Sequence, residues 1–168
     1  MKFGRGLVLA LAAGAAILWA PPEVPAEESG SFSLIATYVR DYTTLEHAAG
    51  TFFGGTLEGT STILTSSGDP FVEGEHSLVT CVVYGKRSAA GLDLETACTT
   101  IDAGGNKIYL VAERSVGGVD AGGGGQGHLE IVGGTGVHAK RRGRCAYETE
   151  YLANDQVVTT ADCTWRME

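Results

Sequence analysis

The segment spanning residues 144–165 has a clear alternation of apolar and polar positions. Its odd-numbered positions, from Cys145 to Trp165, are mostly apolar or aromatic on both sides of a short polar interval, and the even-numbered positions carry nearly all the charge. A period of two is typical of a half-buried β-strand, so we predict strands over residues 144–151 and 156–165. A three-residue turn at 153–155 would place Cys145 directly opposite Cys163 on the apolar face.

Similar β-type patterns precede this hairpin. We predict six further strands, at residues 31–42, 51–66, 76–85, 93–101, 107–115 and 128–132. Residues 43–50 are expected to form a linker with one helical turn at 45–47, and residues 116–127 a flexible glycine loop. Glycines inside the strand at 51–66 indicate bulges or tight curvature, which the closure of a small barrel requires.

About eight strands with turn signals between them, and no amphipathic helix, indicate an all-β domain. The uninterrupted hairpin order favours an eight-stranded antiparallel up-and-down barrel.

The N-terminal residues have the composition of a secretory signal peptide. Lys2 and Arg5 precede an uncharged apolar run at residues 7–20, and Ala26 ends a small-residue cleavage site. We therefore expect a signal peptide at 1–26, a single barrel domain at 27–168 and a periplasmic or secreted location. An uncleaved anchor helix is the alternative, although the run is shorter than the roughly 20 residues that span a bilayer.

The charge balance excludes several classes of partner. Removing Lys2, Arg5 and Glu23 from 12 basic and 20 acidic side chains leaves 10 and 19, a net charge of −9. Such a charge argues against binding to nucleic acids or to anionic membranes. We expect no membrane association after cleavage.

The cysteines predict a disulfide framework. All four lie in the exported part, and an even number in an oxidising compartment indicates two disulfides. Of the three pairings, we favour Cys81–Cys98 and Cys145–Cys163, because each closes a local hairpin. There is no C-x-x-C motif and no histidine at ligand spacing from a cysteine, so we expect no metal site and no cofactor.

Three motifs follow one another between residues 101 and 147: IDAGGNKIY at 101–109, the glycine-rich segment 127–138, and Gly143, Cys145 and Tyr147 in the next strand. In this order they resemble the bacterial proteins of the allene oxide cyclase barrel-like superfamily, which also includes dirigent proteins. The resemblance implies an eight-stranded barrel with an elongated cavity for apolar or phenolic molecules, in which some members steer cyclisation or coupling. The sequence departs from the family pattern after Thr135, so no family catalytic residue is carried over.

Five polar side chains are candidates for chemistry inside such a barrel. Tyr109 and Glu113 share one face of a predicted strand, and His128 and Glu130 share a face of the next. Pointing inward, they would supply an acid or base and a phenol donor; pointing outward, they are ordinary surface residues. Glu58 has the same ambiguity. The catalytic candidates are thus Tyr109, Glu113, His128 and Glu58, and the ligand-binding candidates are Tyr109, His128 and Glu130.

Other features favour structural interpretations. Gly122, Gly124 and Gly127 fit G-x-G-x-x-G, but a β-type segment follows them where a dinucleotide site requires a helix. Residues 140–142 and Arg144 form a basic cluster, either an anion site or a solvated loop that balances nearby carboxylates. Trp165 is expected to lie in the core or to plug one end of the barrel.

The leading functional hypothesis is an exported barrel that binds a small apolar or phenolic molecule. The alternatives are a dirigent-like or cyclase-like isomerase acting through cavity shape, and a non-catalytic scaffold whose function lies on the loops at 117–127 and 140–144. The resemblance also raises the prospect of a homo-oligomer, for which the residues give no independent sign.

Overall fold

The structure, a computed structural model, describes residues 28–168, so the predicted signal peptide lies outside the described residues. The eight strands are β1 (Ser29–His47), β2 (Gly50–Ser66), β3 (His76–Ser88), β4 (Gly91–Asp102), β5 (Lys107–Arg114), β6 (Gly124–Gly134), β7 (Arg141–Tyr151) and β8 (Gln156–Met167). A short 3₁₀ helix, η1 (Gly136–His138), separates β6 from β7. The described part of the chain holds no helix with the length and apolarity needed to cross a bilayer.

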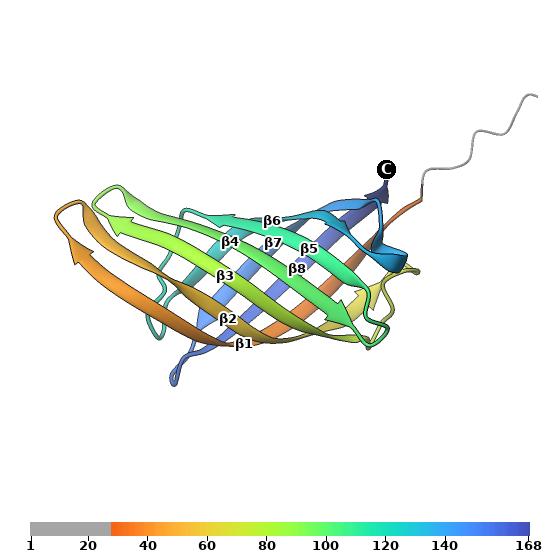
Figure 1. Cartoon of the computed structure of the whole chain (residues 1–168), viewed down its shortest axis with the longest axis horizontal. Helices are drawn as coiled ribbons and strands as arrows, with labels where there is room; N and C mark the ends of the chain where they lie inside the picture. The colour runs from red at the N-terminus through yellow and green to blue at the C-terminus, as the bar shows by residue number, and fades with distance from the viewer. Residues whose placement is uncertain (1–27) are drawn as a thin grey trace, which may run out of the picture.

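The strands form a closed antiparallel barrel in chain order, as Figure 1 shows. Each strand pairs with the next along the chain, and β1 closes the ring by pairing with β8 from Ser29↔Arg166 to Val39↔Gln156. The predicted all-β class, the strand number and the up-and-down order are therefore confirmed. Closure leaves no edge strand within the ring, and β1 continues beyond its last pair with β8, at Val39, into the hairpin with β2.

The predicted register of the last hairpin and both predicted disulfides are confirmed. Cys145 lies directly opposite Cys163, and Cys81 lies directly opposite Cys98. Disulfides join both pairs, with 17 and 18 residues of sequence separation. The turn at 153–155 places Asn154 and Asp155 at positive φ (58° and 59°), the left-handed region in which these two residue types are favoured.

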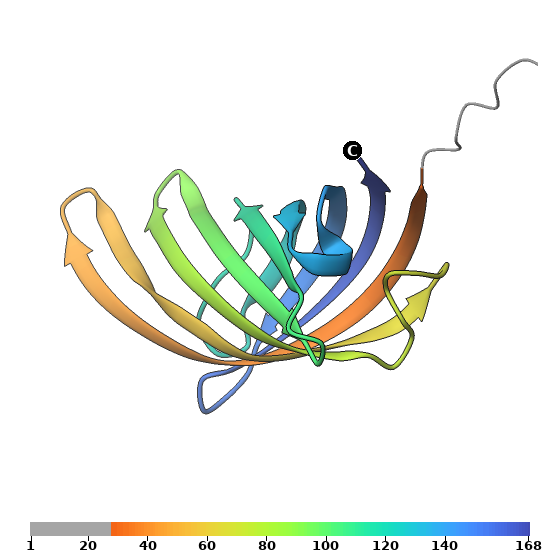
Figure 2. The same ribbon diagram turned by 45° about the vertical axis from the view of Figure 1, so that its right-hand side comes forward.

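Two predicted loops are wrong, because backbone pairing continues beyond the alternating pattern. The expected linker at 43–50 belongs to a long β1–β2 hairpin in which Thr44 pairs with Phe53 and His47 with Gly50. This hairpin projects beyond the barrel core (Figure 2), so both of its faces meet solvent and no alternation marks it. Strand β6 likewise begins at Gly124, within the segment that we expected to be a glycine loop.

The two ends of the barrel are closed by different segments. At one end, here called the Phe71 end, the connection between β2 and β3 at residues 67–75 lies with η1 beside the C terminus (Figure 1). The opposite end, the Val119 end, carries the connection between β5 and β6 at residues 115–123 and the β7–β8 turn.

Candidate functional site

The barrel interior is lined by alternate residues of the strands and contains two clusters of buried side chains. The cluster toward the Val119 end comprises Phe53, Leu57, Val79, Cys81, Val83, Leu92, Leu94, Val119, Tyr151 and Val157. The cluster toward the Phe71 end comprises Phe32, Phe71, Ala112, Ile131, Cys145, Tyr147, Ala161, Cys163 and Trp165. Each disulfide therefore lies inside the barrel, one in each cluster.

Space remains at mid-barrel, where the strands place small side chains such as Ala36, Ser61 and Ala161. One cavity there has a volume of about 60 Å³, and a second of about 50 Å³ lies toward Arg114 and Tyr151. Tyr38, Leu129 and Thr159 line both cavities, so the two are adjacent. A single water needs roughly 10–15 Å³ and a benzene-binding cavity measures about 150 Å³. The interior thus accommodates a small polar group, and an aromatic ring requires one side chain to move.

Phe71 closes the first cavity with a side chain that comes from a loop rather than from a strand. Its ring is 3% exposed and stacks on Phe32 with centroids 3.9 Å apart. Trp165 lies 5.8 Å from the same ring and His138 lies 5.3 Å from it. The expectation that Trp165 packs at one end of the barrel is confirmed. An aromatic ring at this position is already held by aromatic neighbours, an arrangement that suits either a plug or a ligand.

Beside Phe71, a buried Asp–His pair borders the same cavity. His138 Nε2 lies 3.6 Å from Asp102 Oδ2. Asn106 donates to the Asp102 carboxylate from its backbone N–H and from its side-chain amide, both at 2.8 Å. Burial alone would raise the pKa of Asp102, but the hydrogen bonds from Asn106 outweigh it and lower that pKa.

The histidine of this pair is neutral at neutral pH. Burial lowers the pKa of His138, and the opposing effect of the Asp102 carboxylate does not overcome it. The Nδ1 atom of His138 is buried and has no hydrogen-bond partner within residues 28–168. A neutral imidazole with Nε2 facing a carboxylate and Nδ1 without a partner in the described chain can accept a proton at Nδ1.

The Val119 end is closed by a glycine-rich loop that polar contacts hold in place. Val119 is 5% exposed and packs on the interior cluster, and its carbonyl accepts a hydrogen bond from Arg40 Nη1. Arg40 also contacts Asp155 in the β7–β8 turn at 3.0 Å. Arg87 contacts Asp120 in the loop at 2.5 Å. We call these two ion pairs the latches, because each one ties a connection to the barrel rim.

Beneath this loop lies a buried cation, Arg114, which is 3% exposed. Its Nη2 atom donates to the carbonyl of Gly118 at 3.2 Å and to the Tyr151 hydroxyl at 3.4 Å. Its Nη1 atom is buried and has no partner in the described chain. No carboxylate of residues 28–168 forms an ion pair with Arg114, whereas Arg40 has Asp155.

Three tyrosines with raised pKa values, Tyr38, Tyr42 and Tyr147, lie in the interior near Arg114 and Tyr151. Burial raises the pKa of Tyr38 to about 12, and it also raises that of Tyr147 to about 12. The pKa of Tyr42 is raised as well, first by burial and then by the neighbouring Tyr151 phenol. The Tyr42 hydroxyl is buried without a hydrogen-bond partner in the described part of the chain.

Two glycines of β6 create the room for these groups. A Cβ atom at Gly125 would lie 3.1 Å from Arg114 Nη1, and one at Gly127 would lie 2.5 Å from the Tyr147 hydroxyl oxygen. Gly127 therefore belongs to the lining of the barrel, consistent with our view that its place in a G-x-G-x-x-G pattern is accidental.

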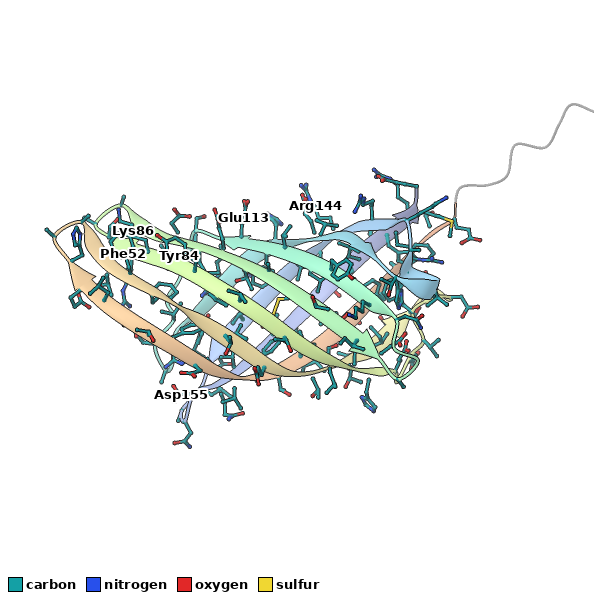
Figure 3. All side chains as sticks on the ribbon, in the orientation of Figure 1. Phe52, Tyr84, Lys86, Glu113, Arg144 and Asp155 are labelled. Atoms are coloured by element: carbon teal, nitrogen blue, oxygen red, sulfur yellow. A yellow bond between two sulfur atoms is a disulfide. The ribbon has the colours of Figure 1, made fainter. Side chains whose placement is uncertain are left out.

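The structure places the polar candidates from the sequence on the outer face of the barrel. Tyr109 is 38% exposed, and Glu113, His128 and Glu58 are also exposed. Figure 3 shows the Glu113 side chain pointing away from the barrel. Glu113 and His128 face each other on β5 and β6, but Glu58 lies on β2 between Val39 and Thr80. The four side chains do not converge inside the barrel.

The ligand-binding candidate Glu130 also faces outward, where it pairs with Arg144 at 2.9 Å. The basic cluster to which Arg144 belongs is split between the outer and inner faces of β7, because successive residues of a strand point to opposite sides. Arg142 contacts Glu168 at 3.2 Å on the surface, whereas Arg141 is buried over the Trp165 ring, 4.9 Å from its centroid. These residues form no common anion site.

The interior polar groups were missed although the sequence carries a signal for them. One apolar face of β5 carries Ile108, Leu110 and Ala112, and Arg114 occupies the next position on that face. Arg40 continues the face of Phe32 to Tyr38 in the same way. A charged residue in phase with an apolar face is the pattern that would have identified both. Residues 28–168 contain no group of three or more His, Cys, Asp or Glu side chains suited to a metal ion.

The comparisons with known proteins give a similarity that concerns the fold. The sequence matches no protein family and no curated protein. The structure is similar to that of the pterocarpan synthase dirigent protein GePTS1, with a TM-score of 0.52 and 12% sequence identity over 87% of this chain and 88% of that one. At this identity the similarity shows a dirigent-like barrel fold.

Proposed function

We propose that this protein is an exported barrel that binds a small apolar or aromatic molecule in its interior. The observation that carries the proposal is the mid-barrel space closed by Phe71, a ring that a loop inserts among Phe32, Trp165 and His138. Movement of this one side chain would join the cavity to a ring-sized site. The two interior disulfides and the signal-like N-terminal sequence support export.

The experiment enlarges the site and measures its occupancy. Phe71→Ala removes the plug, and Phe52→Ala makes the same change on the β1–β2 hairpin outside the barrel core (Figure 3). Binding of benzene and indole is followed by calorimetry and by the shift in melting temperature. We expect Phe71→Ala to bind at least ten-fold more tightly than the wild type, and Phe52→Ala to behave as the wild type does. Absence of aromatic binding to all three proteins would refute the proposal.

Native mass spectrometry of the mature protein, purified from an oxidising compartment, adds a test without mutation. A small molecule released in stoichiometric amount on denaturation would identify the ligand. The denatured, unreduced mass would also locate the cleavage site, which we expect after Ala26.

A second candidate is an isomerase or cyclase acting in the same cavity, which the buried Asp102–His138 pair favours. His138 would take and return a proton, and the cavity would hold the substrate in its reactive conformation. The test is conversion of the identified ligand by the wild type and by His138→Gln, analysed by mass spectrometry and NMR. Loss of conversion with retained binding supports catalysis; recovery of unchanged ligand from the wild type contradicts it.

A further inference from the structure

Arg114 is a charged group whose environment within the described chain leaves its charge uncompensated. Arg114 is buried, with an exposed fraction of 3%. It has the Gly118 carbonyl and the Tyr151 hydroxyl as acceptors for Nη2, and Nη1 has none in residues 28–168. A buried guanidinium is normally paired with a carboxylate, because an isolated buried charge costs several kcal/mol.

The neighbouring side chains cannot supply the missing charge. Burial raises the pKa values of Tyr42 and Tyr147, so these neighbours of Arg114 remain uncharged phenols. The nearby carboxylates of Asp120 and Asp155 are engaged on the rim with Arg87 and Arg40. Tyr151 lies between two cations, since the guanidinium carbons of Arg40 and Arg114 are each 5.4 Å from its ring centroid.

The space beside Arg114 suits a small anionic group. Arg114, Tyr147, Tyr151 and Thr149 line the cavity of about 50 Å³, which by the measure of roughly 10–15 Å³ per water has room for the two oxygens of a carboxylate. The planar fork of an arginine matches a carboxylate geometrically. Thr96 and Thr159 also line this cavity and add hydroxyl groups to its wall.

The lining of the adjoining cavity favours an apolar body for the rest of the ligand. It leads through Tyr38 and Leu129 toward Leu110, Ile131 and Phe71, and is lined mainly by apolar side chains. A ligand extending from Arg114 toward the Phe71 end would therefore be charged at one end and apolar along its body.

We propose that the barrel binds an amphipathic carboxylic acid, with its carboxylate on Arg114 beneath the Val119 loop and its apolar body directed toward Phe71. This inference rests on the proposed binding function and specifies the class of ligand. Arg114 would contribute the charge recognition through Nη1, which has no acceptor in residues 28–168.

The experiment compares two probes that differ only in charge. 3-Phenylpropanoic acid and its primary amide are titrated calorimetrically at pH 7 into the wild type and into Phe71→Ala, in which space for the ring is open. We expect the acid to bind at least ten-fold more tightly than the amide. Equal affinities would overturn the carboxylate proposal and leave the binding barrel intact, whereas binding of neither probe would overturn both.

Variants then locate the charge recognition. Arg114→Met should reduce the affinity for the acid to that for the amide and leave the amide unaffected. It is expected to fold, because an apolar residue of similar length often replaces a buried ion without loss of stability. Arg114→Lys, which keeps the charge, should retain part of the preference for the acid over the amide.

Arg144→Met is the matched control, since Arg144 is 70% exposed on the outer face. It should change neither affinity. Equal loss of acid and amide binding in Arg114→Met would show that Arg114 only holds the Gly118 loop, and would overturn its role in anion recognition.

Discussion

The two ends of the barrel differ in how their buried charges are compensated. At the Phe71 end, Asn106 donates two hydrogen bonds to the Asp102 carboxylate, and Arg141 lies 3.5 Å from Glu28. At the Val119 end, Arg114 forms no ion pair within residues 28–168. Buried polar atoms without partners in the described chain occur at both ends, but a buried cation without a counter-charge favours an anionic ligand.

The segments that close the two ends also differ in how firmly they are held. Phe71 inserts a large ring that three other rings surround, whereas Val119 inserts a small side chain from a loop rich in glycine. The latches that hold this loop are ion pairs with exposed carboxylates, a type of contact that contributes little stability. We therefore expect the Val119 end to open more readily than the Phe71 end.

The largest effect should come from removing the plugs. Phe71→Ala is expected to destabilise the fold by about 3–5 kcal/mol, the usual cost of deleting a buried phenylalanine, and Val119→Ala by about 2 kcal/mol, since it removes two methyl groups. Urea unfolding followed by the fluorescence of Trp165 measures both. Equal losses at the two ends would contradict the asymmetry of closure.

The two disulfides, one toward each end, should contribute nearly equally to the free energy of unfolding. They span 17 and 18 residues, so the loss of chain entropy in the unfolded state is nearly the same. Replacing either cysteine pair by alanine should cost about 3 kcal/mol in urea unfolding. A difference of more than about 1 kcal/mol between Cys81→Ala/Cys98→Ala and Cys145→Ala/Cys163→Ala would arise from packing rather than from loop length.

Alkali should selectively destabilise the tyrosine-rich half. Because the folded pKa values of Tyr38 and Tyr147 are about 12 and the reference value is 10.0, the unfolded chain loses these protons first as pH rises. Their contribution is complete below pH 10 and is lost progressively up to the folded pKa, by about 1.4 kcal/mol per tyrosine at pH 11. Because the pKa of Tyr42 is raised as well, Tyr147→Phe should remove about one third of the total loss between pH 9 and 11. An unchanged slope in this variant would show that Tyr147 is not the source.

The smallest effect belongs to the latches. Asp120→Asn breaks the contact with Arg87 and should cost less than about 1 kcal/mol of global stability. We expect it to increase hydrogen exchange of the backbone amides in residues 115–123 and to leave residues 67–75 unchanged. Equal acceleration at both ends would contradict independent closure.

The strands could be predicted because each of them carries its own evidence. Alternation from Cys145 to Trp165 determined both the register and the disulfide, since opposite residues on one face must meet. For Tyr109 and His128, the sequence could not show whether the side chain points into the barrel or out of it. A period of two sorts residues into two faces, but it does not identify which face is buried. Phe71 and Val119 were missed for another reason: they lie in connections, and the closure of the whole ring determines where a connection ends.

Closure also sets the order in which the chain can fold. Every strand pair except one joins neighbours in sequence, but β1 and β8 bring Ser29 to Arg166. Both disulfides staple hairpins, β3–β4 and β7–β8, and neither crosses this seam. Local hairpins form in about 1–10 μs, whereas contacts between distant residues form slowly. The β1–β8 seam should therefore be the last ladder to gain protection in pulse-labelled hydrogen exchange, and the interior exists as a compartment only after it has closed.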